Sequence, residues 1–213
     1  MSGIFGEARL PTGVEALDRQ LEGGLLPGSV VAYLAPPASQ SELLLMEMTS
    51  QRNSLYLSTA RSEGAVREAF ERTQAPTGDP VVQYVPADAP LDNARQLFRS
   101  VDGEANVIVD PMDTLERSDP ARYQTFLNEL QNHMGNTGSV AMLHCMSGDA
   151  EPELRGMTKH MADVVFDLEV VYDGAEVETR LAVPKFRGGN ALEETIKLEL
   201  AERVRVDTSR DIA

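Results

Sequence analysis

Apolar runs of strand length alternate with helical patterns along most of this chain, and that alternation constrains the fold more than any other feature. Strands are predicted for residues 29–34, 54–58, 81–85, 106–110 and 139–145. Helices are predicted between them, for residues 42–48, 63–72, 91–101 and 119–134. A repeat of strand and helix is typical of an α/β fold with a mostly parallel, twisted sheet covered by helices on both faces.

The last quarter of the sequence has a different pattern. Residues 163–172 and 176–186 are predicted as two strands joined through Asp173-Gly174, a dipeptide that favours a hairpin turn. Residues 195–206 alternate between apolar and polar side chains and are predicted as one further strand. We therefore expect antiparallel strands beside the parallel sheet.

The length of 213 residues is enough for one sizeable core. We expect a single domain over residues 1–213, with a short segment, 1–28, before the first core strand. The lone Cys145 cannot form an internal disulfide, and the three histidines have no zinc-binding spacing. No stretch approaches 18 apolar residues, and the N-terminus lacks the pattern of a signal peptide. These features predict a cytoplasmic protein without membrane insertion.

The charge is strongly negative, with 34 acidic against 19 basic residues and a formal net charge of −15. This excludes a basic nucleic-acid clamp. Only three of the basic residues are lysines, namely Lys159, Lys185 and Lys197. Two interpretations stay open: an ordinary acidic cytosolic protein, or a chain adapted to molar salt, as in halophilic archaea, where screening removes the self-repulsion. Under the second interpretation the net charge says little about partners.

The stretch LPTGVEALDRQLEGGLLPGSVVAYLAPP, at residues 10–37, resembles the opening of RecA-superfamily ATPases of the KaiC and Rad55-like branch. The matching residues are Thr12, Gly13, Leu17, Asp18, Gly23, Gly24, Pro27 and Gly28. The similarity continues in VIVD at 107–110, in HMADVVFDLEV at 160–170 and in VPKFRGG at 183–189. The resemblance covers roughly residues 10 to 190 and implies a RecA-like P-loop fold.

A working phosphate loop follows G-x-x-x-x-G-K-[ST], whose glycines, lysine and hydroxyl contact phosphates and Mg²⁺. The corresponding positions here hold Ala35, Gln40, Ser41 and Glu42, so every defining residue is replaced. Ala38 also stands where the family often has glycine, which makes a positive φ costly. The resemblance therefore implies a degenerate Walker A motif at residues 38–42, Ala38, Ser39, Gln40, Ser41 and Glu42.

Glu42 adds a negative charge beside the place of a negative ligand. Like charges about 4 Å apart repel by roughly 4 kcal/mol at an effective dielectric near 20. Retained backbone donors, at about 1 kcal/mol each, do not offset this repulsion and the loss of the lysine. Ser39-Gln40-Ser41-Glu42 also reads as a capping box, in which Ser39 accepts from the Glu42 N–H and Glu42 reaches back. We expect no resident cofactor, and only weak binding of ATP and Mg²⁺.

Other positions of the resemblance are also informative. Relatives usually carry adjacent glutamates after the second strand, whereas this chain has Ala60 and Arg61, with Glu63 displaced. Asp110 matches the aspartate that orients metal-bound water, although an Asp before a proline also commonly closes a strand. Lys185 and Arg187 match residues that, in ring-forming relatives, reach the nucleotide of a neighbouring subunit; a solvent-facing charge pair is the alternative.

No catalytic residue is predicted. His144 and Cys145 are interpreted as core or rim residues because the sequence places no acidic partner beside them, and Met142, Met146, Met157 and Met161 as packing residues. The leading hypothesis is a RecA/KaiC-like pseudo-ATPase that acts through a protein partner or homo-oligomer in regulation or scaffolding. The alternatives are a weak ATP-binding switch or ATPase with a noncanonical loop, and a DNA-associated recombination or transcription accessory factor. No basic stripe supports nucleic-acid binding.

Overall fold

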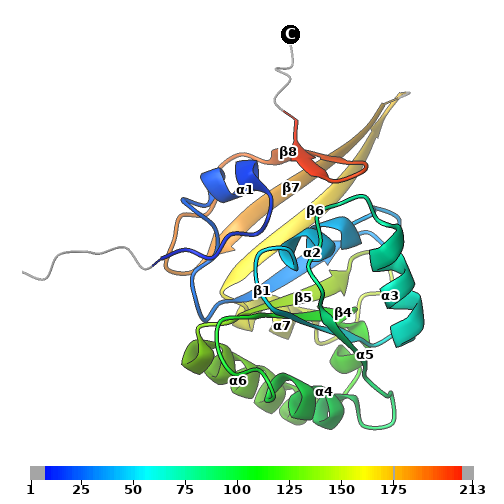
Figure 1. Cartoon of the computed structure of the whole chain (residues 1–213), viewed down its shortest axis with the longest axis vertical. Coiled ribbons are helices and arrows are strands. Elements are labelled where there is room, and N and C mark those ends of the chain that lie inside the picture. The colour runs from blue at the N-terminus through cyan, green and yellow to red at the C-terminus, as the bar shows by residue number, and fades with distance from the viewer. Residues whose placement is uncertain (1–7, 175, 208–213) are drawn as a thin grey trace, which may run out of the picture.

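The computed structural model describes residues 8–174 and 176–207, and shows one nine-stranded sheet with helices on both faces (Figure 1). The strands are β1 (Val30–Ala35), β2 (Ser54–Ser58), β3 (Val81–Tyr84), β4 (Asn106–Asp110), β5 (Val140–Met146), β6 (Val164–Asp173), β7 (Glu176–Phe186), β8 (Ile196–Leu200) and β9 (Val204–Val206). The helices are α1 (Glu15–Gln20), α2 (Glu42–Met48), α3 (Glu63–Arg72), α4 (Pro90–Phe98), α5 (Asp113–Glu116), α6 (Pro120–Thr137) and α7 (Arg155–Met161).

The strand order across the sheet is β3-β2-β4-β5-β1-β6-β7-β8-β9. The first six strands in this order run parallel, and β7, β8 and β9 extend the sheet in antiparallel fashion. The predicted α/β architecture, a mostly parallel sheet with C-terminal antiparallel strands, is confirmed.

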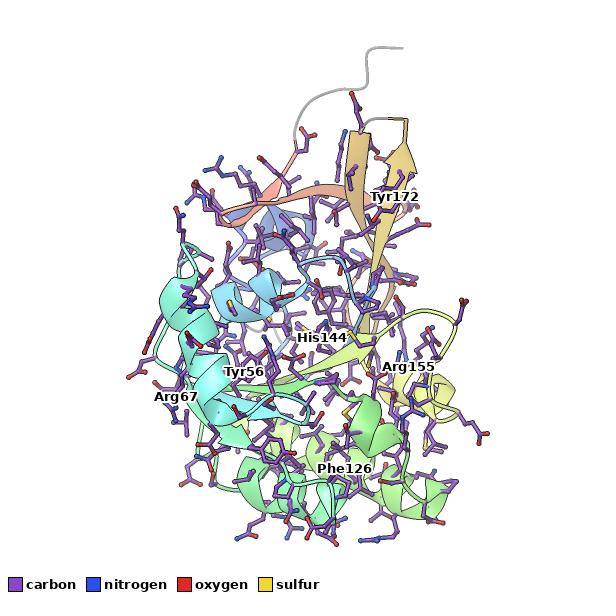
Figure 2. All side chains as sticks on the ribbon, turned by 90° about the vertical axis from the view of Figure 1, so that its right-hand side faces the viewer. Tyr56, Arg67, Phe126, His144, Arg155 and Tyr172 are labelled. Atoms are coloured by element: carbon purple, nitrogen blue, oxygen red, sulfur yellow. The ribbon has the colours of Figure 1, made fainter. Side chains whose placement is uncertain are left out.

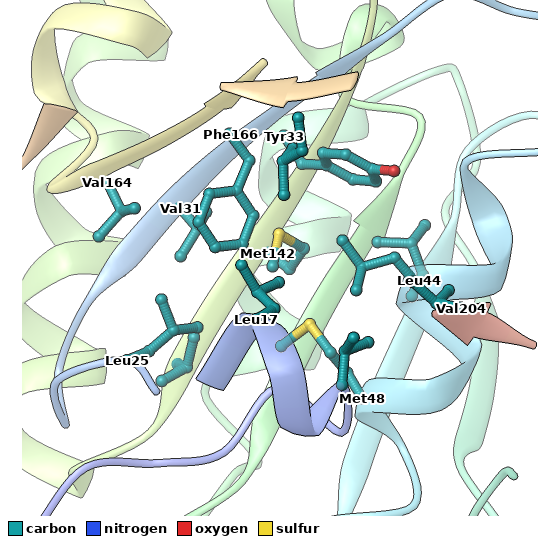
Figure 3. Close-up of a cluster of buried hydrophobic side chains, with 14 of the residues drawn as sticks. Leu17, Leu25, Val31, Tyr33, Leu44, Met48, Met142, Val164, Phe166 and Val204 are labelled. Carbon is teal, nitrogen blue, oxygen red and sulfur yellow. The ribbon is translucent and has the colours of Figure 1, made fainter. Parts of the chain in front are cut away.

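Each face of the sheet buries its own apolar cluster. On one face α1, α2, α3 and β9 pack through side chains such as Leu17, Leu44 and Val204 against Val31 and Phe166 of the sheet (Figure 3). On the other face α4 to α7 pack against the alternate strand residues. Burial on both faces explains why the central strands are continuous apolar runs in the sequence.

Helix α6 shows how local sequence sets an element's limits. Asp119 accepts hydrogen bonds from the N–H groups of Ala121 and Arg122, and Pro120 occupies the first turn. Gly138 ends the helix with φ 68°, a conformation that glycine adopts without strain. The predicted apolar face is buried, namely Tyr123, Phe126, Leu127, Leu130 and Met134.

Two features of the sequence prediction differ from the structure. The single strand predicted for residues 195–206 is wrong: a turn at 201–203 separates β8 from β9, which then fold back on each other. The alternation is interrupted at Ala201 and Glu202, but the apolar residues on the two sides of the turn, such as Leu200 and Val204, stay in phase, so the pattern resembles one continuous strand. Helices α1, α5 and α7 were not predicted. Helices α1 and α5 have six and four residues, too few turns for a clear period, and α7 has seven.

Strands β6 and β7 form a hairpin whose outer part extends away from the helices (Figure 1). The register shifts between Val165 and Asp167, where β7 carries an extra residue next to Pro184. A proline without an N–H is tolerated at such a bulge. Within the described residues, no helix is long and apolar enough to cross a membrane. Residues 1–7 of the predicted N-terminal segment lie outside the described residues.

Candidate functional site

The carboxyl ends of β1, β2, β4 and β5 meet at one edge of the parallel sheet. In open α/β sheets this edge is where ligands bind. The loop 36–41 follows β1 there, and the segments that follow β2, β4 and β5 surround it. The edge therefore brings together the residues that the sequence singled out in the loop and Asp110.

The loop after β1 turns at Gln40, which has φ 53° although it is not glycine. Gln40 stands where the P-loop pattern has its second glycine, so the positive φ lies at Gln40 and not at Ala38. The predicted capping box is wrong. The Ser39 hydroxyl donates to the carbonyl of Pro36 at 2.5 Å, and α2 begins after Ser41 without a side-chain cap. The left-handed turn at Gln40 directs Ser39 back into the loop and away from the helix.

Ser41, His144 and Asp110 form a continuous hydrogen-bonded chain. Ser41 Oγ lies 2.9 Å from His144 Nε2, and His144 Nδ1 lies 2.6 Å from Asp110 Oδ1. The three residues come from the start of α2 and the ends of β5 and β4. The arrangement has the order of a serine–histidine–aspartate relay. All three side chains are buried, so the Ser41 hydroxyl is closed to a substrate.

The second oxygen of Asp110 is also occupied. Asp110 Oδ2 accepts hydrogen bonds from the Tyr56 hydroxyl at 2.5 Å and from the Arg61 guanidinium at 2.9 Å. Burial by itself would raise the pKa of Asp110, but His144, Tyr56 and Arg61 outweigh it and lower this pKa to about 2. Burial and the Asp110 charge raise the pKa of the Tyr56 hydroxyl well above its usual value. Figure 2 shows Tyr56 and His144 in the interior of the molecule.

Tyr33 completes the packing around this network. Its ring stacks on the His144 imidazole with 5.3 Å between centroids, and its hydroxyl donates to the carbonyl of Ser41 at 3.3 Å. Burial, together with the charge of Glu42, raises the pKa of Tyr33. Ser41 and His144 are thus held from the sheet side as well as by each other.

The described residues contain no group of three or more His, Cys, Asp or Glu side chains that could hold a metal ion. Asp110, the predicted metal residue, is instead saturated by its three protein donors. Arg61 places a cation, with its side chain 39% exposed, next to the carboxylate where Mg²⁺ would lie. Three hydrogen-bond donors, one of them cationic, suit a carboxylate that is neutralised within the protein. They do not suit a divalent cation, which is bound by oxygen ligands.

Lys185 and Arg187 lie toward the other end of the parallel strands, away from the loop after β1. Lys185 is level with Val165, which is paired with Ala32 near the amino end of β1, whereas the loop follows the carboxyl end. The Lys185 ammonium donates to the carbonyls of Lys159 and His160 at the end of α7, and Arg187 pairs with Asp163 at 2.6 Å. Neither side chain can therefore reach the loop of its own chain. That they reach a neighbouring subunit stays a prediction.

A second buried polar cluster, which the sequence did not predict, lies beside the end of β5. The Arg155 guanidinium contacts both carboxylate oxygens of Glu116 at 2.9 Å, contacts Asp113 at 3.1 Å, and donates to the carbonyl of Met146. Thr158 also donates to Glu116. The cluster joins α5 to α7 under the segment after β5. The signal available in the sequence was weak, because Glu116 and Arg155 are 39 residues apart.

The remaining predicted residues have structural positions. Glu63 accepts the N–H of Tyr84 at 3.1 Å and so ties α3 to β3. Cys145 and Met142 are fully buried, and Met157 and Met161 pack on the cluster beneath α6, as predicted. The sequence missed the acidic partner of His144, although a clue was present: β4 ends its apolar run at Asp110, and His144 is a polar residue within the apolar run of β5.

Three comparisons place the chain among known proteins. It is similar to the DNA repair protein RadA of Mycobacterium tuberculosis, strain CDC 1551, with 32% identity over 114 residues, covering 51% of this chain and 23% of the relative. It is similar to the DNA repair protein RadA of Rickettsia prowazekii with 24% identity over 183 residues, covering 78% of this chain and 40% of the relative. The chain thus spans less than half the length of these curated relatives.

Among solved structures, the KaiC-like protein PH0186 from Pyrococcus horikoshii superimposes with a TM-score of 0.77 at 12% sequence identity. The superposition covers 95% of this chain and all of that one. The fold is therefore RecA/KaiC-like. A family model described as a family of unknown function, DUF7125, matches residues 9–213. On this match, which spans nearly the whole sequence, the chain belongs to the DUF7125 family.

Proposed function

We propose that this chain is a RecA/KaiC-like protein that has lost nucleotide chemistry and acts through protein contacts, in a regulatory or scaffolding role. The observation that carries the proposal is the network of Ser41, His144 and Asp110 at the carboxyl edge of the sheet. Side chains of the protein itself satisfy the polar groups that a nucleotide and its metal would engage. Its Walker A motif is, in this proposal, degenerate.

Charge supports the same proposal. Mg²⁺ at Asp110 would have to displace the Arg61 guanidinium, which lies 2.9 Å from Oδ2. A triphosphate at the loop would lie near Glu42 and would lack the lysine that Ser41 replaces. Repulsion of roughly 4 kcal/mol per pair of like charges at about 4 Å exceeds what a backbone donor returns. The residues present therefore do not fit ATP and Mg²⁺.

A second candidate, a DNA-associated accessory factor, is favoured by the similarity to DNA repair proteins called RadA. The acidic charge of the segment after β5 argues against this second candidate. Asp149, Glu151 and Glu153 are all exposed there, at the same edge as the loop after β1. Acidic side chains repel the phosphates of a nucleic acid, whose binding is dominated by contacts with lysine and arginine.

Titration of fluorescently labelled ATP with Mg²⁺ tests the leading proposal. We expect no saturation below about 1 mM, which corresponds to a binding free energy weaker than about −4 kcal/mol. A micromolar dissociation constant would contradict the proposal. The Glu42→Ala variant should be titrated in the same way. If it binds ATP about tenfold more tightly than the natural chain, the hypothesis of a weak nucleotide switch replaces that of a pseudo-ATPase.

A gel-shift assay at moderate salt tests the second candidate. We expect no shift with single- or double-stranded DNA. Light scattering after size-exclusion chromatography should accompany both assays, because a stable dimer or hexamer decides whether Lys185 and Arg187 have a neighbouring site. A DNA shift that Lys185→Ala abolishes would favour the accessory factor.

A further inference from the structure

Ser41, His144 and Asp110 have the geometry of an activated serine, a property that goes beyond the proposed loss of nucleotide chemistry. A general base lies about 2.6–3.2 Å from the group whose proton it takes, and a third group orients the base. Ser41 Oγ lies 2.9 Å from His144 Nε2, and His144 Nδ1 lies 2.6 Å from Asp110 Oδ1. Each nitrogen of the histidine therefore faces the partner that such a role requires.

The three residues also stand where a serine nucleophile is found in one class of hydrolases with a parallel sheet. In those enzymes the serine occupies a sharp, strained turn between a strand and a helix, and the chain order is serine, aspartate, histidine. Ser41 here lies between β1 and α2 and directly follows Gln40, whose φ is 53°. Asp110 of β4 and His144 of β5 come later in the same order. This constellation recurs on unrelated folds and is recognised by its geometry.

The Ser41 hydroxyl is buried, but the network lies close beneath the surface. Gln40 precedes Ser41 and is exposed, and Glu42 follows it and is half-buried. The Arg61 side chain, which contacts Asp110 at 2.9 Å, is 39% exposed. The network is therefore separated from solvent by only a thin layer of protein.

The loop 36–40 is weakly attached to the rest of the fold. Among the described residues, its hydrogen bonds are only those from Ser39 Oγ to the Pro36 carbonyl and from the Leu43 N–H to the Gln40 carbonyl. Neither bond joins the loop to a strand. The left-handed conformation of Gln40 is strained for a residue other than glycine and persists only while the surrounding structure imposes it. Movement of the loop thus breaks few bonds and relieves this strain.

We propose that Ser41 is a nucleophile that becomes reactive when the loop 36–40 moves, with His144 as its general base and a small uncharged carboxylic ester as its substrate. Ser41 Oγ attacks the ester carbonyl carbon while its proton passes to His144 Nε2. The bond to the alkoxy group then breaks, and His144 returns the proton to the departing alcohol. Water hydrolyses the acyl-serine by the same route, which releases a carboxylic acid and restores Ser41.

Backbone donors and charge near Ser41 select this class of substrate. The N–H groups of residues 39–41 have no hydrogen-bond partner among the described residues, and such donors stabilise the oxyanion of an acyl-transfer intermediate. The carboxylate of Glu42 disfavours an anionic acyl group. Arg61, the cation in contact with the network, is engaged by Asp110 and does not offset Glu42 at the serine. An uncharged ester avoids the repulsion.

A fluorophosphonate probe tests the nucleophile, because it forms a stable bond to an activated serine with loss of fluoride. We expect labelling at Ser41, located by peptide mass spectrometry and absent in Ser41→Ala. His144→Gln should slow labelling at least about hundredfold, as loss of a general base does. Ser39→Ala should label about fivefold faster than the natural chain, because it removes one hydrogen bond that holds the loop closed.

The matched control is Ser100→Ala. Ser100, which follows α4, also donates its hydroxyl to the carbonyl three residues earlier, at 2.7 Å from the oxygen of Leu97. This variant should label at the natural rate. Circular dichroism of each variant separates a lost reaction from a lost fold, and the comparison of Ser39→Ala with Ser100→Ala decides the matter if His144→Gln does not fold.

Two esters test the class of substrate, neutral p-nitrophenyl acetate and anionic mono-p-nitrophenyl succinate, each with the rate of Ser41→Ala subtracted. We expect the neutral ester to be hydrolysed at least about tenfold faster, and Glu42→Gln to reduce this preference. Equal rates for the two esters, or no hydrolysis that depends on Ser41, overturns the assigned substrate.

The inference as a whole is overturned by labelling that persists in Ser41→Ala, or by no labelling of either the natural chain or Ser39→Ala. Equal rates in Ser39→Ala and Ser100→Ala overturn the role of the loop. The proposed function is judged separately, because tight ATP binding with intact labelling at Ser41 overturns that function alone.

Discussion

Replacing Asp110 with asparagine tests whether the carboxyl-edge network is an internally satisfied ionic structure. The change keeps the size of the side chain and removes its charge. His144, Tyr56 and Arg61 all bond to this carboxylate, so one substitution acts on the whole network. If the network fills the site as proposed, its loss is measured as a loss of folding stability.

The magnitude follows from the pKa of Asp110. Burial opposes ionisation, yet the three donors hold this pKa at about 2, against an ordinary value of 3.8. The difference corresponds to about 2 kcal/mol of stabilisation of the folded state by the ionised form. We therefore expect Asp110→Asn to lower the free energy of unfolding at neutral pH by about 2 kcal/mol. With a urea slope of about 2–3 kcal/mol/M, the midpoint moves by roughly 1 M.

The pH dependence has a definite sign. A carboxylate with a lowered pKa stabilises the folded state fully above about pH 4, and this stabilisation is lost as pH falls toward 2. The difference in stability between the natural chain and Asp110→Asn should therefore shrink over that range. Urea unfolding followed by circular dichroism at several pH values measures it, and other titrating carboxylates cancel in the difference.

Asp92→Asn is the control, because Asp92 forms ion pairs with Arg95 and Arg122 at a side-chain exposure of 49%. Exposed pairs contribute about 0–1 kcal/mol. The reasoning is refuted if Asp110→Asn costs no more than this control, or if its effect is the same at pH 3 and pH 7.

Two further substitutions address other buried carboxylates. Glu116→Gln leaves the buried Arg155 without its closest ionic partner and should cost about 3 kcal/mol, seen as a lower thermal midpoint; a cost below about 1 kcal/mol, as expected of exposed pairs, would show that Asp113 suffices. Burial, opposed by the Val204 N–H and the charge of Arg203, raises the pKa of Glu47 above its ordinary 4.5. The natural chain should thus lose stability relative to Glu47→Gln as pH rises above 4.5, and a constant difference between pH 4 and 7 would contradict this.

The fold was predictable from the sequence because strands that are buried on both faces are continuous apolar runs. The ranges 54–58, 63–72 and 176–186 agree with β2, α3 and β7. Periodicity gives only a weak signal for the fold-back between β8 and β9, because the apolar residues before and after the three-residue turn, such as Leu200 and Val204, stay in phase. Short helices such as α5 are also missed by periodicity, since four residues complete barely one turn.

The site was predictable only in part. A parallel sheet places the ends of β1, β4 and β5 at one edge, and the sequence indicated Ser41 and Asp110 there. It did not indicate that β5 lies between β4 and β1, which is the arrangement that brings His144 to both. Strand order is a property of long-range packing, so the relay through His144 emerges only in three dimensions. The capping-box interpretation failed because local patterns do not report the backbone angle at Gln40.

That angle has a wider consequence. Holding a residue other than glycine at φ 53° costs on the order of 1–2 kcal/mol, which the surrounding structure must supply. The path of the loop is therefore imposed by the strand before it and the helix after it, and does not depend on glycine. A loop whose path is set in this way keeps its course when its side chains are exchanged. The backbone path of this loop therefore does not report what the loop binds, and its chemistry depends on the side chains that it carries.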